Sequence, residues 1–150
     1  MKANKFNVDS LFPNSYIEIG NFLYKELFEI YKSNREIVFI CIGTDRCTGD
    51  SLGPLIGYKS KQFFKDLSNK KLFLYGSLEF PIHSKNIVDI INKIKFNFEN
   101  PYIVAIDSCL GSITNIGKVF IDRNPIFPGL AVNRDLPPVG DLSITGIVNI

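Results

Sequence analysis

Two aspartates follow apolar runs of strand length in this 150-residue chain. Asp50 lies in GTDRCTGDSLGP (residues 43–54), directly after the run EIVFICI, and Asp107 lies at the end of the run PYIVAIDS (residues 101–108). Two carboxyl groups held close together cannot both ionise cheaply, so the pKa of one rises and that of the other falls. Such a pair can share a proton, one member activating water while the other protonates a leaving group. Acid–base hydrolysis is therefore the chemistry that these residue types offer.

Each of these features also has a structural interpretation. An aspartate at position 50 is an ordinary N-cap for a helix that begins there, and Asp107 can simply bind loop backbone. Gly43, Gly49 and Gly53 suggest a phosphate loop, but their spacing matches neither common nucleotide motif, and no lysine stands where a Walker loop needs one. The spacing disfavours a nucleotide site and leaves the structural and catalytic interpretations of the two aspartates open.

The single histidine and two of the three cysteines fall on the same group of loops. His83 follows the second apolar run, while Cys47 and Cys109 follow the first and the third. A Cys–His nucleophile pair or a metal cluster is conceivable there. Thiolate activation needs a basic partner that the sequence does not identify, and His83 can equally shape the entry to a helix. We expect no cofactor; a metal, if bound, would take Asp50, Asp107 and His83 as ligands.

The elements that must position these residues alternate along the chain. An amphipathic helix over about 15–33 comes first, and strand-like and helical patterns then follow in turn, at residues 36–43, 50–69, 70–77, 84–95 and 101–108. Such alternation implies a parallel sheet with helices on both faces. We therefore predict an α/β fold, a three-layer α/β/α sandwich with a mostly parallel central sheet.

The strand order decides where the two aspartates lie. If the strand at 70–77 packs outside the strand at 36–43, the order reverses between 36–43 and 101–108, and a crevice opens at their carboxyl ends. Asp50 and Asp107 would both face this crevice. Side chains on the surrounding loops are expected to bind or support the substrate, namely Thr44, Asp45, Ser51, His83 and Ser108.

The pattern changes after Asp107. Residues 111–122 alternate and carry turn residues, which favours a hairpin or an edge strand. Residues 123–141 contain four prolines and little periodicity, as in a binding loop or lid. Residues 142–150 predict a final strand. We expect all of 1–150 to form a single domain, since this length can bury a sizeable core.

Composition excludes several classes of protein. A net charge of +2 without a block of basic residues disfavours a nucleic-acid partner. No apolar stretch approaches the roughly 20 residues that span a bilayer, so no membrane partner is expected. The first residues lack the apolar core of a secretory signal, and three cysteines without CxxC spacing favour a reducing compartment. We expect a cytoplasmic protein.

Four segments in a fixed order resemble a known family. These are CIGTDRCTGDSLGPLIG, LYGSLEFPIHSKN, VAIDSCLG and LPPVGDLSITGIVN, within residues 36–150. They resemble sporulation proteins of the YyaC type, described as spore proteases and similar to spore germination protease and the hydrogenase maturation endopeptidases. The resemblance implies an endopeptidase of aspartic type that acts on a protein or peptide, such as small spore proteins, in the cytoplasm of a forespore or spore.

The resemblance also assigns roles to individual residues. The aspartates proposed as the catalytic pair of germination protease, in a PDALGP stretch and at the end of an IDA strand, correspond to Asp50 and Asp107. In the maturation endopeptidases these positions are acidic nickel ligands, completed by a later histidine. Residues 110–150 contain no histidine, so a nickel site would need His83 from another loop.

The end of the chain carries a further expectation. Relatives continue past the TGIVN strand into a helix, whereas this chain stops at Ile150, so the C-terminal part of the family pattern is expected to be missing. Apolar surface left uncovered there predicts a homo-oligomer. Two alternatives to the peptidase stay open, a non-catalytic sporulation factor that binds a peptide or partner in the same crevice and a metal-dependent hydrolase.

Overall fold

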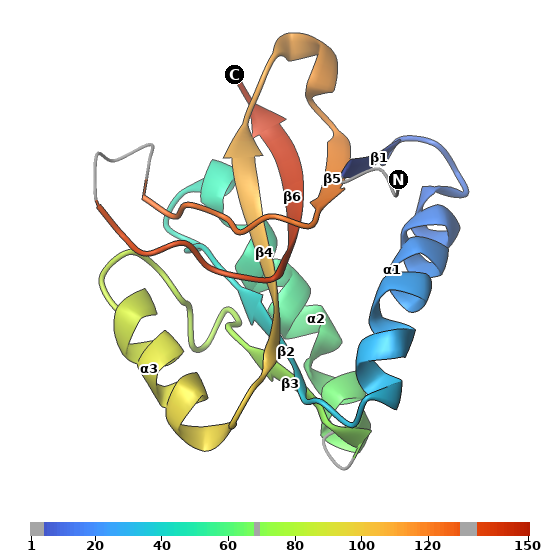
Figure 1. The fold of residues 1–150 in the computed structure, drawn as a ribbon. Helices are drawn as coiled ribbons and strands as arrows, with labels where there is room; N and C mark the ends of the chain where they lie inside the picture. Colours follow the sequence, from blue (N-terminus) through green and yellow to red (C-terminus); the bar gives the residue numbers. More distant parts are fainter. Residues whose placement is uncertain (1–4, 68–69, 130–134) are drawn as a thin grey trace.

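The computed structural model describes residues 5–67, 70–129 and 135–150, which fold around a six-stranded sheet in the order β1-β5-β6-β4-β2-β3 (Figure 1). The strands are β1 (Lys5–Asp9), β2 (Ile37–Cys41), β3 (Leu72–Tyr75), β4 (Tyr102–Leu110), β5 (Lys118–Asp122) and β6 (Leu142–Asn149). The helices are α1 (Ser15–Lys32), α2 (Leu52–Leu67) and α3 (Ile87–Asn97), with 3-10 turns η1 (Thr48–Asp50) and η3 (Ile113–Asn115).

The central strands of the sheet are parallel. β2 pairs in parallel with β3 on one side and with β4 on the other, and β4 continues in parallel to β6. β5 and β1 join antiparallel at the far side. The expected mostly parallel α/β sheet is confirmed, and β3 lies outside β2 as predicted.

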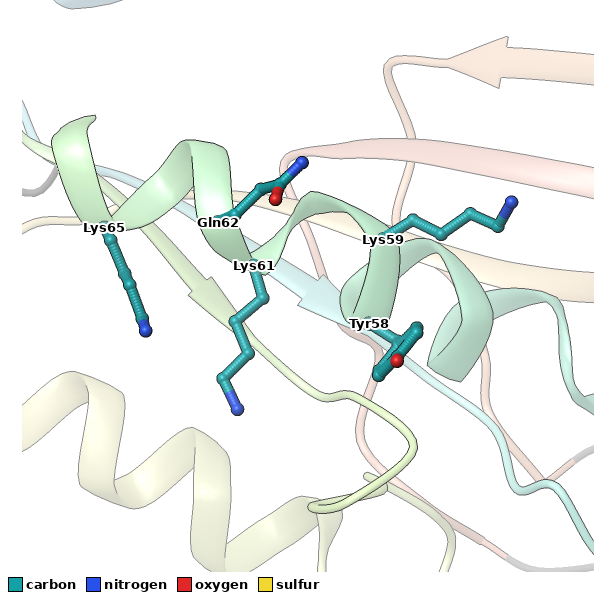
Figure 2. A pocket seen from close by; sticks show the side chains of 5 residues that line it. All are labelled: Tyr58, Lys59, Lys61, Gln62 and Lys65. Carbon is teal, nitrogen blue, oxygen red and sulfur yellow. The ribbon is translucent and has the colours of Figure 1, made fainter.

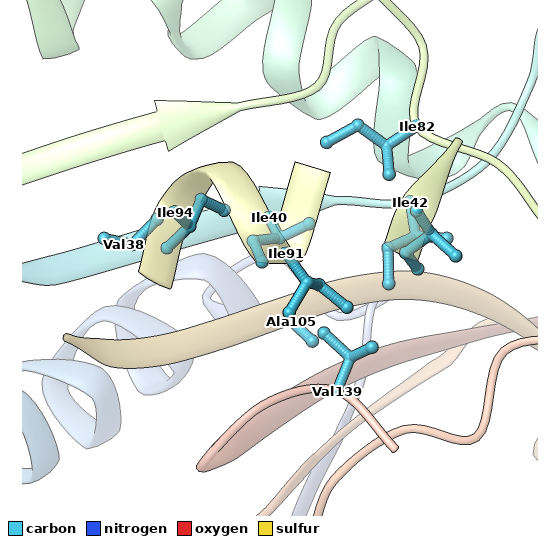
Figure 3. Close-up of a cluster of buried hydrophobic side chains, with 9 residues drawn as sticks. Val38, Ile40, Ile42, Ile82, Ile91, Ile94, Ala105 and Val139 are labelled. Carbon is cyan, nitrogen blue, oxygen red and sulfur yellow. The ribbon is translucent and has the colours of Figure 1, made fainter. Parts of the chain in front are cut away.

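Two buried clusters cover the two faces of the sheet. On one face, α3 contributes Ile91 and Ile94 to a cluster with Val38 and Ile40 of β2 and with Ile42, which follows β2 (Figure 3). On the opposite face, α1 packs its apolar stripe against the other set of strand residues. α2 covers that same face, since the ring of Phe64 lies edge-on against Phe39 of β2 at 5.2 Å. The three layers of the predicted sandwich are therefore α1 with α2, the sheet, and α3.

The helices are amphipathic rather than uniformly apolar. α1 buries Ile19, Leu23, Leu27 and Ile30 on one stripe, as its spacing predicts, and exposes Tyr24 and Phe28 on the other side. Within the described parts of the chain, no helix combines the length and the apolar character that crossing a membrane requires.

Two expectations about the strands are wrong. β1 was not predicted, because KFNVD is short and polar and only Val8 is buried in it. The segment 111–122 is neither a hairpin nor an edge strand. β6 lies between β4 and β5, and β1 pairs with the outer side of β5, so that β5 is an interior strand.

The ends of the predicted loop at 123–141 are fixed parts of the structure. Ile126 and Val139 exchange two backbone hydrogen bonds of 2.8 Å, and Val139 belongs to the core cluster beneath α3. The N–H of Asp141 donates to the carbonyl of Ile103 in β4 at 2.7 Å, so this end of the segment lies against β4. Residues 130–134, the centre of the expected binding loop, lie outside the described residues.

Candidate active site

The sequence predicts a crevice at the carboxyl ends of β2 and β4. These strands are neighbours, and the chain leaves β2 toward β3 on one side but reaches β4 on the other, so the strand order reverses between them. Asp50 ends the η1 turn that follows β2, and η1 contacts β4. Asp107 stands in the second half of β4. Both aspartates thus lie at the carboxyl ends of the strands, where parallel sheets hold their ligands.

Glycines in the first loop allow the backbone to approach itself closely. Gly43 adopts a positive φ of 137°, and a Cβ atom there would lie 2.1 Å from the carbonyl oxygen of Asp50. A Cβ on Gly53 would lie 2.0 Å from the carbonyl oxygen of Ile42, which shows that α2 begins directly against the end of β2. Gly43 and Gly53 therefore serve packing.

Asp107 is half-buried, and its environment favours the protonated form. Burial, followed by the negative charge of Asp50, raises the pKa of Asp107 to about 7. The N–H of Ser108 donates a 2.8 Å hydrogen bond to Oδ1 of Asp107 and opposes this rise. Near neutral pH, Asp107 therefore exchanges its proton readily, as a general acid must.

Asp50 has more partners that favour the ionised form. Burial raises the pKa of Asp50, but three groups lower it, namely the backbone N–H of Thr44, the charge of His83 and the hydroxyl of Ser108. The backbone also ties Asp50 to the loop, because its carbonyl accepts the N–H of Thr44 at 2.9 Å. The two aspartates therefore have unequal surroundings, and Asp50 is the member that ionises first.

His83 combines a structural and an electrostatic role. Its carbonyl accepts the N–H groups of Asn86 and Ile87 at 3.0 Å each, and its Nδ1 accepts the N–H of Lys85 at 3.3 Å. These bonds shape the entry to α3, as the structural interpretation proposed. Its charge acts on Asp50 as well, so His83 also belongs to the surroundings of the pair.

Two other residues predicted for the site, Ser51 and Asp45, lie in the first loop. Ser51, not Asp50, precedes α2, because the carbonyl of Ser51 accepts the first helical hydrogen bond, from the N–H of Leu55. The N-cap interpretation of Asp50 is therefore wrong. The hydroxyl of Ser51 donates to the carbonyl of Thr48 at 2.9 Å and closes the η1 turn. Asp45 is exposed on the loop.

The cysteines are all free thiols with different exposure. Cys47 and Cys109 are exposed, whereas Cys41 is buried in β2, and burial raises the pKa of Cys41 to about 12. A buried thiol of this kind is unreactive. Among the described residues, no three His, Cys, Asp or Glu side chains gather as a metal site requires, so Asp50, Asp107 and His83 do not form one together.

One further polar residue stands beside Asp107. Thr145 of β6 is the register partner of Asp107 in the parallel β4–β6 pair and is half-buried. Partners in a ladder leave the same face of a sheet, so the side chains of Thr145 and Asp107 lie on one face. The signal for Thr145 in the sequence is weak, a polar residue within the final apolar run.

Two comparisons relate the chain to known proteins. Over 118 residues the chain is 47% identical to the uncharacterized protein YyaC of Bacillus subtilis (strain 168). The match covers 79% of this chain and 56% of that relative, so the chain spans a little over half the length of the curated relative. Residues 7–150 match the family described as protein of unknown function DUF1256. The chain thus belongs to the DUF1256 family.

Proposed function

We propose that this chain is an endopeptidase of aspartic type, in which Asp50 and Asp107 hydrolyse a peptide bond of a protein substrate. The observation that carries the proposal is that two unequal carboxyl groups influence each other electrostatically at the carboxyl ends of β2 and β4, where the strand order reverses. Pairs of titratable groups whose surroundings separate their pKa values are typical of acid–base catalysis.

The proposed reaction divides the proton transfers between the two residues. Ionised Asp50 takes a proton from water, whose oxygen attacks the carbonyl carbon of the scissile bond. Protonated Asp107 gives its proton to the carbonyl oxygen, which yields a tetrahedral diol. Asp50 then passes its proton to the leaving nitrogen, the C–N bond breaks, and Asp107 recovers its proton from the diol. Water is added across the bond, and both aspartates return to their starting states.

The residues around the pair have supporting roles in this proposal. The N–H of Thr44 and the hydroxyl of Ser108 keep Asp50 ionised, and the charge of His83 does the same. The resemblance of four ordered segments to spore proteases supports a role in sporulation or germination, in the cytoplasm of a forespore or spore, with small spore proteins among the substrates.

The proposal is tested by digestion of a peptide library, with the products identified by mass spectrometry. A proteome-derived peptide library is incubated with the wild-type chain and with Asp107→Asn, and new termini are counted. We expect cleavage by the wild type and none by Asp107→Asn, which lacks the acid. Cleavage by both proteins at the same sites would contradict the aspartate mechanism. Absence of cleavage by both, together with retention of peptides by the wild type, would support the alternative of a non-catalytic binding factor.

A further inference from the structure

β3 is an edge of the sheet, and its outer side has no strand partner within the described parts of the chain. The N–H of Ile37 donates to the carbonyl of Lys71 at 2.9 Å, which fixes the phase of the parallel ladder. Alternate residues of such a ladder face away from the partner strand, so Leu72 and Leu74 direct their N–H and C=O groups outward. An edge of this kind can accept a further strand.

A row of lysines on α2 runs beside this edge. Gly57, Lys61 and Lys65 are four residues apart and therefore lie on one line of the helix. Gly57 touches the end of β3, since a Cβ there would lie 1.9 Å from the carbonyl oxygen of Gly76. In Figure 2, Lys61 and Lys65 point from α2 to the same side, whereas Lys59 points away from them. Lys61 and Lys65 are called the lysine row below.

One cavity lies along the exposed side of α2, and a second lies at the end of β3 on the α3 face. The cavity on the α2 face has a volume of about 580 Å³, and its lining contains no carboxylate, only Tyr58, Lys59, Lys61, Gln62 and Lys65 (Figure 2). The cavity on the α3 face, of about 430 Å³, has a mixed lining that includes Tyr75, Glu79, Phe80, His83, Ile90 and Lys93. One face of the edge is thus basic, and the other is largely apolar with one charge of each sign.

We propose that the free edge of β3 and the lysine row bind an extended acidic segment of a protein, which joins the sheet as a further strand. Side chains of a strand alternate between the two faces. Acidic side chains would then meet the lysine row, and apolar side chains would enter the cavity lined by Tyr75, Phe80 and Ile90. His83 lines that cavity, and its charge also acts on Asp50, so the edge of β3 leads toward the proposed active site. Extended acidic protein segments are then the substrate class of the proposed peptidase. That the bound segment is cleaved rests on the proposed function.

The charges beside the free edge of β3 favour an acidic protein segment over other occupants. A second copy of β3 would bring a second lysine row, whose like charge disfavours edge-to-edge pairing. Lys61 contacts Glu79 at 3.9 Å, but both side chains are nearly half exposed, so this weak ion pair can exchange for a carboxylate of the bound segment. A nucleic acid has no peptide backbone with which to continue the ladder at Leu72 and Leu74.

The experiment measures binding of a dye-labelled ten-residue peptide of alternating Glu and Val by fluorescence anisotropy, with Asp107→Asn as the receptor so that cleavage cannot interfere. We expect the Lys61→Glu, Lys65→Glu double variant to bind about tenfold more weakly or worse, because two rim ion pairs become two repulsions. A matched double variant on α1, Lys25→Glu with Lys32→Glu, changes the net charge equally and should bind as the unmodified receptor does.

Two further probes separate strand addition from charge attraction. The same peptide with N-methyl groups on alternate amides keeps its charges but cannot donate to the ladder, and it should not bind. Binding of the unmodified peptide should also slow hydrogen exchange at the amide N–H groups of Leu72 and Leu74. Equal binding of the methylated peptide, equal loss in the α1 control, or tighter binding of a single-stranded oligonucleotide would each overturn the proposal.

Wild-type protein then distinguishes docking from catalysis. Binding of the peptide without cleavage would leave the docking site standing and count against the peptidase. Cleavage that is unchanged by Lys61→Glu with Lys65→Glu would support the peptidase and contradict the docking site.

Discussion

The two ends of the parallel strands each hold a cluster of charged side chains, and the clusters are built in opposite ways. At the carboxyl end, Asp50 and Asp107 have the same charge, and burial raises the pKa of both. At the amino end, Arg123 follows β5 and donates through two guanidinium nitrogens to both oxygens of Glu26 on α1. The Arg123 and Glu26 side chains are only 25% and 14% exposed, and the guanidinium lies 5.8 Å from the ring centre of Phe22.

The difference separates a cluster that stabilises the fold from the pair to which we assign the proposed chemistry. A paired, bidentate Arg–Glu contact satisfies its own charges and fastens α1 to the sheet. A pair of carboxyl groups repels itself, so it costs stability wherever both members are ionised. Strain of this kind is typical of functional sites rather than of structural ones. The predictions below test this division of roles.

Activity should depend on one end of the sheet alone. Asp50→Asn and Asp107→Asn should each lower the hydrolysis rate by about 10²–10⁴-fold, because each removes one proton-transfer group. Arg123→Met, at the other end, should leave the rate per folded molecule within about twofold, since it touches no reacting group. The measurement is cleavage of a library-derived peptide by the three variants at equal folded concentration. A comparable loss of rate in Arg123→Met would contradict the prediction that activity depends on the carboxyl end alone.

Stability should depend on the amino end. Arg123→Met should lower the free energy of unfolding by about 2–3 kcal/mol, because the largely buried carboxylate of Glu26 is left without its partner. Urea unfolding measures this loss. Glu26→Gln combined with Arg123→Met should cost less than the two single changes added together, since the pair is lost once. Strict additivity would show that the two residues act independently.

At the carboxyl end, removing a charge should stabilise the protein. The pKa of Asp107 is about 7 in the folded state and lies near its ordinary value of 3.8 in the unfolded chain. Between about pH 4 and 7 the folded state therefore keeps a proton that the unfolded chain has lost, and the free energy of unfolding falls as pH rises. Asp107→Asn should lack this slope and gain about 1–2 kcal/mol at pH 8, after allowance for partial exposure. If the variant keeps the same dependence of unfolding free energy on pH, a group other than Asp107 causes it.

The pH dependence of activity should sharpen the roles within the pair. The proposed mechanism needs ionised Asp50 and protonated Asp107, so kcat/KM should fall as pH rises through about 7. Ser108→Ala removes a hydroxyl that lowers the pKa of Asp50, and the acid limb should therefore move to higher pH. A shift of the alkaline limb instead would reverse the assignment of acid and base.

The smallest effect concerns self-association, which stays a prediction from the sequence. Around the carboxyl end of the sheet, Leu110, Ile113 and Ile116 are exposed at 56%, 74% and 41%. Exposed apolar side chains gathered in one region are typical of contact surfaces. Light scattering should show a mass that rises with concentration, and Ile113→Ser should weaken this rise by a few fold. A constant monomer mass in both proteins would remove the expectation.

Much of the fold and the centre of the site followed from local patterns. Continuous apolar runs marked β2, β3 and β4, and the stripe of Ile19, Leu23, Leu27 and Ile30 marked α1, because burial on one or both faces leaves its period in the residues themselves. Asp50 and Asp107 could be selected for the same reason, since polar residues that end buried strands of a parallel sheet must meet at one edge.

What only the tertiary structure decided is the pairing of distant segments. Val8 pairs with Val119 across the β1–β5 ladder, which makes β5 an interior strand, although neither segment carries a pattern that names its partner. Arg123 and Glu26 are 97 residues apart, and their charges alone do not select each other among the other charged side chains. Thr145 becomes a neighbour of Asp107 only through the β4–β6 register. Local sequence sets which face of an element is buried, whereas partners and edges depend on which surfaces remain free once the whole chain has packed.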